Sequence, residues 1–252
     1  MTDRWILTPQ YFETHEPALA SVCPDTAVLN GPHPIPDREE DSMATLHRPI
    51  AGFVQTAIRD GVRPVSVAGD CCASVPVLAG MLAGGVRPTL VWLDAHGDFN
   101  TPETSPSQFL GGMPLAMMVG RGPQWMCEAV GLAPFAEERI WAIDLRDLDP
   151  LERAALDASA VRRTGMAGLA TLKIDGPVLV HIDMDVMNAR EVGAFNYPVP
   201  GGPSVAETVA ACGAFAAANQ VAALSVSGWT GSLDKDGRTG AACGQVIDAI
   251  LS

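Results

Sequence analysis

The sequence predicts a single-domain α/β protein in which a mostly parallel sheet lies between two layers of helices, a three-layer α/β/α arrangement. Short apolar runs rich in β-branched residues alternate with segments of helical length, which is the pattern of βαβ units. Three of these runs end at a cluster of acidic residues. The chain has 252 residues, a length that one α/β domain can reach because both faces of its sheet are buried.

Five apolar runs are expected to be buried parallel strands, because apolar side chains occupy both faces of each run. These runs are residues 64–68, 89–93, 139–143, 177–182 and 222–226. The expected helices are residues 74–83, 114–119, 151–158, 204–218 and 240–251. Ser204 and Glu207 form a capping-box pattern at the start of one of them. Residues 23–41 contain four prolines, which predict an irregular surface loop rather than a domain boundary.

The composition restricts the partners and the compartment. The chain has 16 basic and 29 acidic residues and no run of Lys or Arg, so nucleic acid is not an expected partner. No segment approaches the roughly 18 uninterrupted apolar residues of a membrane span. The first residues lack the features of a secretory signal, and the six cysteines lack the spacing of a disulfide framework. We therefore expect a cytoplasmic protein that does not bind membranes.

Acidic residues follow three of the expected strands. They are Asp70 beside Cys71, then Asp94 and Asp98 around His96, then Asp183 and Asp185. Because the carboxyl ends of parallel strands lie at one edge of a sheet, we expect these side chains to meet in space. Several carboxylates share a small volume only when cations compensate their charge. Mixed oxygen, nitrogen and sulfur ligands suit a pair of first-row divalent ions, and the many carboxylates favour Mn²⁺ over a structural Zn²⁺.

Each cluster also has a purely structural interpretation. Asp94 would cap a helix, His96 would be a hydrogen-bonded core histidine, and Asp183 with Asp185 would be loop acids. One cluster alone does not decide between the two interpretations. The occurrence of all three at strand ends favours the metal site.

The order of these motifs resembles the arginase/agmatinase (ureohydrolase) family over about residues 64–232. The Asp-Ala-His-Gly-Asp motif of residues 94–98 is the most specific feature, and the segments 98–102 and 112–114 and the Asp-Met-Asp of residues 183–185 follow in the family's order. The resemblance implies one arginase-like hydrolase domain over residues 1–252 and two Mn²⁺ ions. The implied metal ligands are Cys71, Asp94, His96, Asp98, Asp183 and Asp185. Asp94 and Asp183 would bridge the ions, and Asp98 and Asp183 would serve catalysis.

The resemblance also implies a substrate class. In the arginase branch, the positions of Asn100 and Ser107 bind the substrate's α-carboxylate, and that of Asp149 binds its α-ammonium. The partner would be a small guanidino amino acid rather than a decarboxylated amine, and the family often forms homo-oligomers. The structural alternative is that Asn100 and Ser107 make turns and that Asp149 caps a helix before Pro150.

Three positions depart from the family pattern. Cys71 replaces a metal-binding His, Gly111 replaces a proton-shuttling His, and Gly228 replaces a Glu that pairs with the guanidinium. A thiolate is softer than an imidazole, so a weakly occupied metal site and an unligated core thiol are both compatible with Cys71. Restoring Glu at position 228 is expected to move the substrate preference toward arginine.

These departures favour a less basic substrate. An N-hydroxyguanidine is more often neutral than a guanidine and needs no buried carboxylate partner. The leading hypothesis is hydrolysis of Nω-hydroxy-L-arginine to L-ornithine and hydroxyurea, a reaction suited to antibiotic biosynthesis. Ordinary arginase or another guanidino-acid hydrolase is the alternative within the family. A catalytically silent arginase-like binding subunit and a hydrolase with a nucleophilic cysteine remain as alternatives from other classes.

Overall fold

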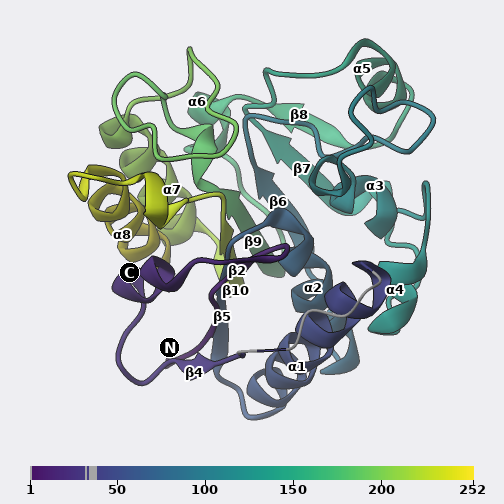
Figure 1. The fold of residues 1–252 in the computed structure, drawn as a ribbon, viewed down its shortest axis with the longest axis horizontal. Coiled ribbons are helices and arrows are strands. Elements are labelled where there is room, and N and C mark those ends of the chain that lie inside the picture. The colour runs from purple at the N-terminus through teal and green to yellow at the C-terminus, as the bar shows by residue number, and fades with distance from the viewer. Residues whose placement is uncertain (1, 32, 34–38) are drawn as a thin grey trace.

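The central feature of the computed structural model is a parallel sheet, which crosses the molecule in Figure 1. The structure describes residues 2–31, 33 and 39–252. Within them, the sheet has eight strands, and every neighbouring pair is parallel. In spatial order the strands are β4 (Val28–Leu29), β1 (Asp3–Thr8), β5 (Arg63–Ala68), β10 (Gln220–Ser227), β9 (Pro177–Asp183), β6 (Thr89–Leu93), β7 (Ile140–Ile143) and β8 (Arg162–Thr164).

Helices cover both faces of this sheet (Figure 1). One layer contains α1 (Glu39–Arg59), α2 (Ser74–Ala83), α3 (Pro114–Met118), α4 (Trp125–Ala129) and α5 (Pro150–Asp157). The other contains α6 (Met166–Leu169), α7 (Val205–Ala218) and α8 (Arg238–Leu251). Leu90 and Trp92 of β6 face the first layer, whereas Val91 and Leu93 face the second. Burial on both faces confirms the predicted three-layer α/β/α fold.

The strands and helices that carry long apolar patterns were predicted closely. All five expected strands form, and α2 spans the expected residues 74–83. Ser204 caps α7, with its hydroxyl accepting from the Glu207 amide at 3.2 Å, which confirms the capping box. No helix in the described part of the chain is long and apolar enough to cross a membrane.

The N-terminal quarter was predicted poorly. Strand β1, helix α1, the edge strand β4 and the hairpin of β2 (Gln10–Tyr11) with β3 (Thr14–His15) were missed there, and the other edge strand, β8, was missed farther along the chain. The loop predicted for residues 23–41 is wrong in part, because Val28–Leu29 pair with β1 and α1 begins at Glu39. Three of its four prolines, Pro32, Pro34 and Pro36, lie outside the described residues. Edge strands of two or three residues are too short to carry a hydrophobic pattern, so tertiary pairing decides them.

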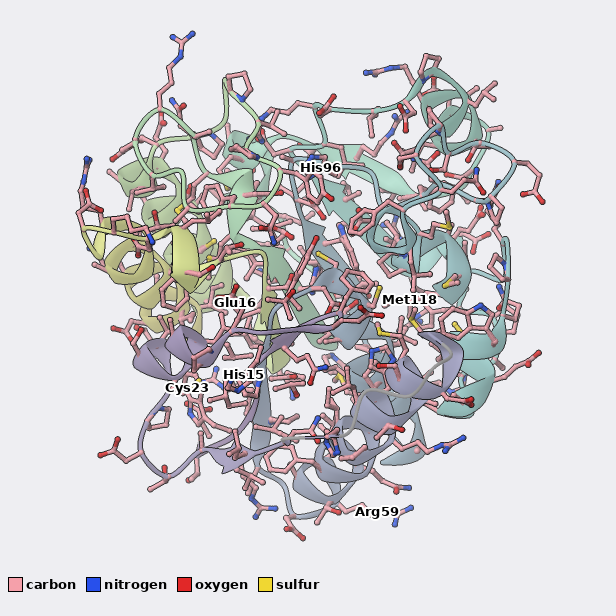
Figure 2. The ribbon with its side chains drawn as sticks, in the orientation of Figure 1. His15, Glu16, Cys23, Arg59, His96 and Met118 are labelled. Atoms are coloured by element: carbon pink, nitrogen blue, oxygen red, sulfur yellow. The ribbon has the colours of Figure 1, made fainter. Side chains whose placement is uncertain are left out.

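The strand order brings the acidic motifs together. Strands β5, β10, β9 and β6 are consecutive neighbours at the centre of the sheet, and their carboxyl ends lie at one edge. Ser227 at the end of β10 is in register with Asp183 at the end of β9. Figure 2 shows His96, just beyond β6, toward the opposite end of the molecule from Arg59, where α1 ends. The sheet therefore positions the site at the edge that the sequence predicted.

Arg63 joins three distant segments at the other edge of the sheet. Its Nε donates to Asp3 Oδ1 at 2.6 Å, and its Nη2 donates to Asp3 Oδ2 at 3.1 Å and to the Leu251 carbonyl at 2.6 Å. Arg63→Met leaves a carboxylate and a carbonyl unpaired, so we expect the free energy of unfolding to fall by about 2–3 kcal/mol. Urea unfolding followed by circular dichroism measures this change.

The exposed pair of Arg4 with Asp60 offers a matched control. Arg4 Nη1 and Asp60 Oδ2 are 2.8 Å apart, but both side chains are substantially exposed. Arg4→Met should therefore change the free energy of unfolding by less than about 1 kcal/mol. Equal losses for the two variants would contradict a special role for Arg63.

Candidate active site

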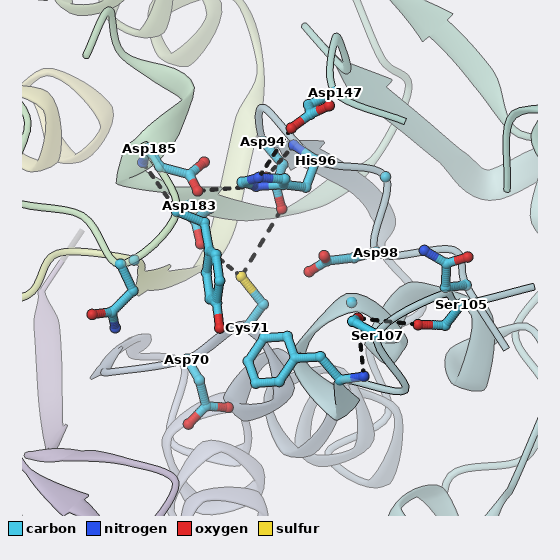
Figure 3. Close-up of a pocket in the computed structure, with 18 of the residues that line it drawn as sticks. Asp70, Cys71, Asp94, His96, Asp98, Ser105, Ser107, Asp147, Asp183 and Asp185 are labelled. Atoms are coloured by element: carbon cyan, nitrogen blue, oxygen red, sulfur yellow. Dashed lines mark hydrogen bonds and ion pairs between the residues drawn. The ribbon is translucent and has the colours of Figure 1, made fainter. Parts of the chain in front are cut away.

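A pocket of about 370 Å³ lies at the carboxyl edge of β5, β6, β9 and β10. All six sequence-predicted metal ligands line it, and Figure 3 shows them converging from separate strand ends. Cys71 Sγ lies 2.9 Å from Asp183 Oδ2 and 4.0 Å from Asp94 Oδ2. His96 Nδ1 lies 3.0 Å from Asp185 Oδ2 and 3.5 Å from Asp94 Oδ1. Cys71 and Asp183 are 112 positions apart in sequence, so side chains from distant segments form one cluster.

The same turn ends each of the three strands. Asp70 Oδ1 accepts from the Cys72 amide at 3.0 Å, Asp94 Oδ1 from the His96 amide at 2.7 Å, and Asp183 Oδ1 from the Asp185 amide at 2.8 Å. Asp side chains commonly stabilise turns in this way. The predicted loop role of Asp183 is therefore present, whereas no helix follows Asp94 in residues 95–109, so Asp94 does not cap one. Each turn also directs the next donor side chain back toward the pocket, so the two interpretations are compatible.

Asp98 has a strained backbone and a buried, unpaired oxygen. Its φ is +48°, a region that costs an L residue roughly 1–2 kcal/mol. Its carbonyl accepts from the amides of Leu115 and Ala116 at 2.9 and 3.1 Å, so the start of α3 holds this conformation in place. Within the described part of the chain, Asp98 Oδ2 has no hydrogen-bond partner. A buried carboxylate oxygen of this kind calls for a proton or a cation.

Burying these acidic side chains close together costs electrostatic free energy. Burial, and then the neighbouring carboxylates, raise the pKa of both Asp98 and Asp183 well above the usual range, and burial and Asp94 also raise that of Asp185. Burial and the charges of Asp183, Asp98 and Asp94 raise the pKa of the Cys71 thiol. Positive charge in the cluster would stabilise all of these anions.

The same negative charges stabilise the protonated form of His96. Burial lowers its pKa, but the hydrogen bonds and charges of Asp185 and Asp94 outweigh burial and raise the pKa to about 12. The oxygen, nitrogen and sulfur donors, together with the unpaired Asp98 oxygen, fit divalent cations. His96, Asp94 and Asp185 have one ligand atom each within 4.8 Å of the others, close enough to share an ion.

The residues expected to bind the substrate's amino-acid end lie on one side of the pocket. Asn100 Nδ2 donates to Asp149 Oδ2 at 3.0 Å, and Asn100 Oδ1 accepts from Thr104 Oγ1 at 2.9 Å. Ser107 Oγ accepts from the Phe109 amide at 3.2 Å, and Asp149 immediately precedes α5. The turn and cap interpretations are therefore present in the structure. The three side chains nevertheless line the same pocket as the acidic cluster.

Sequence reasoning missed two kinds of pocket residue. Aromatic rings from separate segments form a chain of contacts, Tyr11 with Phe12, Phe12 with Phe109, and Phe109 with Tyr197, at centroid distances of 5.1, 5.3 and 5.3 Å. No local pattern marks this aromatic wall. Glu152 was also missed, although its spacing from Asp149 matches a capping box. It accepts from the Phe99 and Asp149 amides at 2.9 and 3.2 Å, and burial raises its pKa to about 7.

Gly111 and Gly228, the two glycines that depart from the family pattern, are closely surrounded by other side chains. A Cβ at Gly111 would overlap the Phe109 ring, which occupies the space beside it. Gly228 has φ +86°, and a Cβ there would overlap the Asp183 carboxylate. Gly228→Glu would therefore displace Asp183 rather than simply supply a partner for a guanidinium. The expected shift toward arginine does not follow from this geometry.

Comparison with known proteins agrees with the fold and the motif order. The Arginase family model matches residues 22–252, so the chain belongs to the Arginase family. The chain is 32% identical over 184 residues to the N(omega)-hydroxy-L-arginine amidinohydrolase of Streptomyces lavendulae, a match that covers 67% of this chain and 64% of that protein. It is 27% identical over 225 residues to the arginase of Bacillus subtilis, covering 84% and 76% of the two chains.

The fold comparison is equally consistent. The crystal structure of arginase from Bacillus cereus has a TM-score of 0.86 and 22% identity, with 100% of this chain and 99% of that chain covered. These findings confirm the predicted family and fold. Family relatives are hydrolases that act on C–N bonds of linear amidines, and this chain is an enzyme of that class.

The space around Gly228 yields a prediction. In Gly228→Ala the added methyl group must displace the Asp183 carboxylate and adopt a positive φ, so we expect an activity loss of about 100-fold or more. Gly112→Ala is the matched control in the same pocket, because its Cβ would meet no atom within 4 Å. Steady-state kinetics of amidine hydrolysis compares the variants. If Gly228→Ala turned over substrate at the wild-type rate, catalysis would not depend on the exact position of the Asp183 carboxylate.

Proposed function

We propose that this protein is a binuclear-metal amidinohydrolase that hydrolyses the guanidino-type group of an α-amino acid, with Nω-hydroxy-L-arginine as substrate and L-ornithine and hydroxyurea as products. The convergence of Cys71 and five acid or imidazole side chains in one pocket is the observation that carries this proposal. The substrate end of the proposal rests on Gly228 and the aromatic wall.

The metal ligands divide into two sets around two shared acids. Asp94 and Asp183 would lie between two Mn²⁺ ions, Cys71 and Asp98 would complete one set, and His96 and Asp185 the other. When bound, two divalent cations offset the repulsion among the carboxylates and lower the pKa of water in the site toward neutrality. The 2.9 Å approach of Cys71 Sγ to Asp183 Oδ2 supports a place for Cys71 in the first set.

Asp98 is suited to carry a proton during hydrolysis. Its Oδ2 is buried and unpaired among the described groups, and burial raises the pKa of its carboxyl. Asp98 can therefore accept a proton from the attacking water and return it to the departing amine nitrogen. The carbonyl contacts to α3 hold the side chain in one position, which reduces the reorganisation that this transfer requires.

The amino-acid end would bind where Asn100, Ser107 and Asp149 line the pocket. Asn100 and Ser107 can donate hydrogen bonds to an α-carboxylate, and Asp149 can accept from an α-ammonium. The Asn100 to Asp149 hydrogen bond of 3.0 Å holds the two groups together. This arrangement favours an α-amino acid over a decarboxylated amine.

The guanidino end favours a weakly basic group. Gly228 offers no carboxylate of its own, and the aromatic wall lines the same pocket. An arginine guanidinium is always charged and would enter without a dedicated carboxylate partner at this position, whereas a hydroxyguanidine is more often neutral. Arginine or another guanidino acid is the second candidate, which the arginase relatives favour.

Two other classes fit the site less well. A silent binding subunit would not need Asp94, Asp98 and Asp183 buried together at an energetic cost. A nucleophilic cysteine needs a depressed pKa, whereas burial and three carboxylates raise the pKa of Cys71. We also propose a cytoplasmic location and homo-oligomers. We propose one domain over residues 1–252, because β1 and α8 contribute to the same hydrophobic core.

Metal dependence is the first prediction. Removal of bound metal by a chelator should abolish turnover, and added Mn²⁺ should restore it, because the carboxylates ionise together only around cations. Asp183→Asn should lose at least one ion per chain in elemental analysis, whereas Asp175→Asn, an exposed acid outside the pocket, should retain both. Undiminished turnover in metal-free protein would contradict the proposed mechanism.

Substrate preference is the second prediction. We expect kcat/KM for Nω-hydroxy-L-arginine to exceed that for L-arginine by about tenfold or more, equivalent to about 1.4 kcal/mol of transition-state stabilisation. Agmatine and guanidinobutyrate, assayed in parallel with Mn²⁺, should be poorer substrates because they lack the α-amino-acid group.

Asp149→Asn separates the two ends of the substrate. It should lower kcat/KM for arginine and hydroxyarginine alike and leave their ratio unchanged, because both carry the same α-ammonium. Equal wild-type efficiencies for the two compounds would exclude the hydroxyarginine assignment and leave the amidinohydrolase assignment intact.

A further inference from the structure

A histidine that the proposed mechanism does not use lies below the acidic cluster. His181 belongs to β9, two residues before Asp183, and its side chain is fully buried. The ring stacks on Trp92 with a centroid distance of 3.9 Å, and its Nδ1 lies 3.1 Å from Ser225 Oγ. Trp92 and Ser225 are the residues in register with His181 on the two neighbouring strands. The sheet therefore holds the imidazole from both sides.

The other ring nitrogen has no such contact. His181 Nε2 is buried without a hydrogen-bond partner within the described part of the chain. A buried polar atom left unpaired loses its hydrogen bonds to water without replacing them, so it needs a physical explanation. If Nδ1 donates to Ser225 Oγ, Nε2 presents a lone pair. Metal-binding histidines typically have this arrangement, with the second ring nitrogen fixed by a hydrogen bond.

Two further ligand atoms lie near the His181 ring. A ring nitrogen of His181, Cys71 Sγ and an Asp94 carboxylate oxygen all lie within 4.8 Å of one another. Cys71 Sγ and Asp94 Oδ2 are 4.0 Å apart. An ion about 2.3 Å from sulfur and about 2.1 Å from oxygen can bridge atoms up to about 4.4 Å apart. Small side-chain rotations would bring all three atoms onto one ion.

We propose that Cys71, Asp94 and His181 form a metal subsite in which His181 Nε2 is a ligand, and that this subsite selects Zn²⁺ over Mn²⁺. The inference rests on the proposed metal centre and specifies which side chains hold one of its ions. With His181 as a ligand, this subsite has a sulfur and a nitrogen donor beside a carboxylate, instead of mainly carboxylates. The other subsite, around His96 and Asp185, keeps its carboxylates.

The donor chemistry supports this choice of ion. Thiolate and imidazole are softer than carboxylate, and Zn²⁺ binds sulfur and nitrogen donors more tightly than Mn²⁺ does. The neighbouring pair of Asp94 and Asp185 around His96 is richer in oxygen. The preference for Zn²⁺ over Mn²⁺ should therefore be larger at the Cys71 subsite than at the His96 subsite.

Co²⁺ is a suitable probe, because a thiolate bound to Co²⁺ gives a near-ultraviolet charge-transfer band. Full-length protein freed of metal would be titrated with Co²⁺, and bound Co²⁺ would then be displaced with Zn²⁺ or with Mn²⁺. We expect the wild type to show the band and to lose it at a Zn²⁺ concentration at least about 100-fold lower than the Mn²⁺ concentration required. Cys71→Ser should bind Co²⁺ without the band.

His181→Asn tests the imidazole. Asparagine can keep a polar atom near the Nδ1 position for Ser225 and lacks Nε2, so we expect Co²⁺ affinity at the band-forming site to fall at least tenfold. His47→Asn is the matched control, because His47 is also buried with an unpaired ring nitrogen among the described residues but lies in α1, where the described residues place no group of possible metal ligands around it. Asp185→Asn should leave the band intact and weaken the second Co²⁺ ion. Circular dichroism would verify that each variant folds.

Each outcome has a definite meaning. Unchanged Co²⁺ affinity and band in His181→Asn would overturn the assignment of His181. Co²⁺ binding without the band in wild type would exclude the thiolate while leaving the metal centre intact, and no Co²⁺ binding at all would contradict the centre itself. A crystal structure of the wild type with one equivalent of Zn²⁺ provides a test that needs no variant. We expect the ion about 2.1 Å from His181 Nε2, and an ion bound only by the other acids would overturn the proposal.

Discussion

The repulsion among buried carboxylates at the carboxyl edge of the sheet is the constraint on which the rest of this structure depends. Asp94, Asp98, Asp183 and Asp185 are each at most 7% exposed, in a region where charge is poorly solvated. Burial and the neighbouring carboxylates raise the pKa of Asp98, Asp183 and Asp185, so the fold alone does not compensate these charges. Only added positive charge makes such a cluster favourable, and divalent cations supply it most compactly.

The fold contributes rigidity to this unfavourable cluster. Four consecutive central strands place its members, and three similar turns direct the side chains into one pocket. The hydrophobic layers on both faces provide the stability that the acids reduce. Strain is concentrated at Asp98, where contacts with α3 keep a left-handed backbone in place. A family of this kind can then vary its substrate through single side chains around a fixed metal-binding edge.

The departures from the family pattern act together in this pocket. Gly228 leaves room for the Asp183 carboxylate, the Phe109 ring occupies the space beside Gly111, and Cys71 approaches both Asp183 and Asp94. The space and charge that Glu and His side chains would supply are thus partly replaced by aromatic surface and a thiol. A ring nitrogen of His181 also lies within 4.8 Å of that thiol's sulfur.

The sequence by itself determined the layers of the fold, the edge at which the site lies and the identity of its acidic residues. Apolar runs such as 89–93 are buried on both faces, and this local property leaves a readable pattern. Asp94 and Asp183 could be located because they follow such runs directly. Tertiary structure alone decided the pairing of β1 and β4, the aromatic wall, the lack of space at Gly228 and the approach of His181 to Cys71. These features depend on contacts between segments far apart in the chain, and such contacts leave no periodicity in the residues that make them.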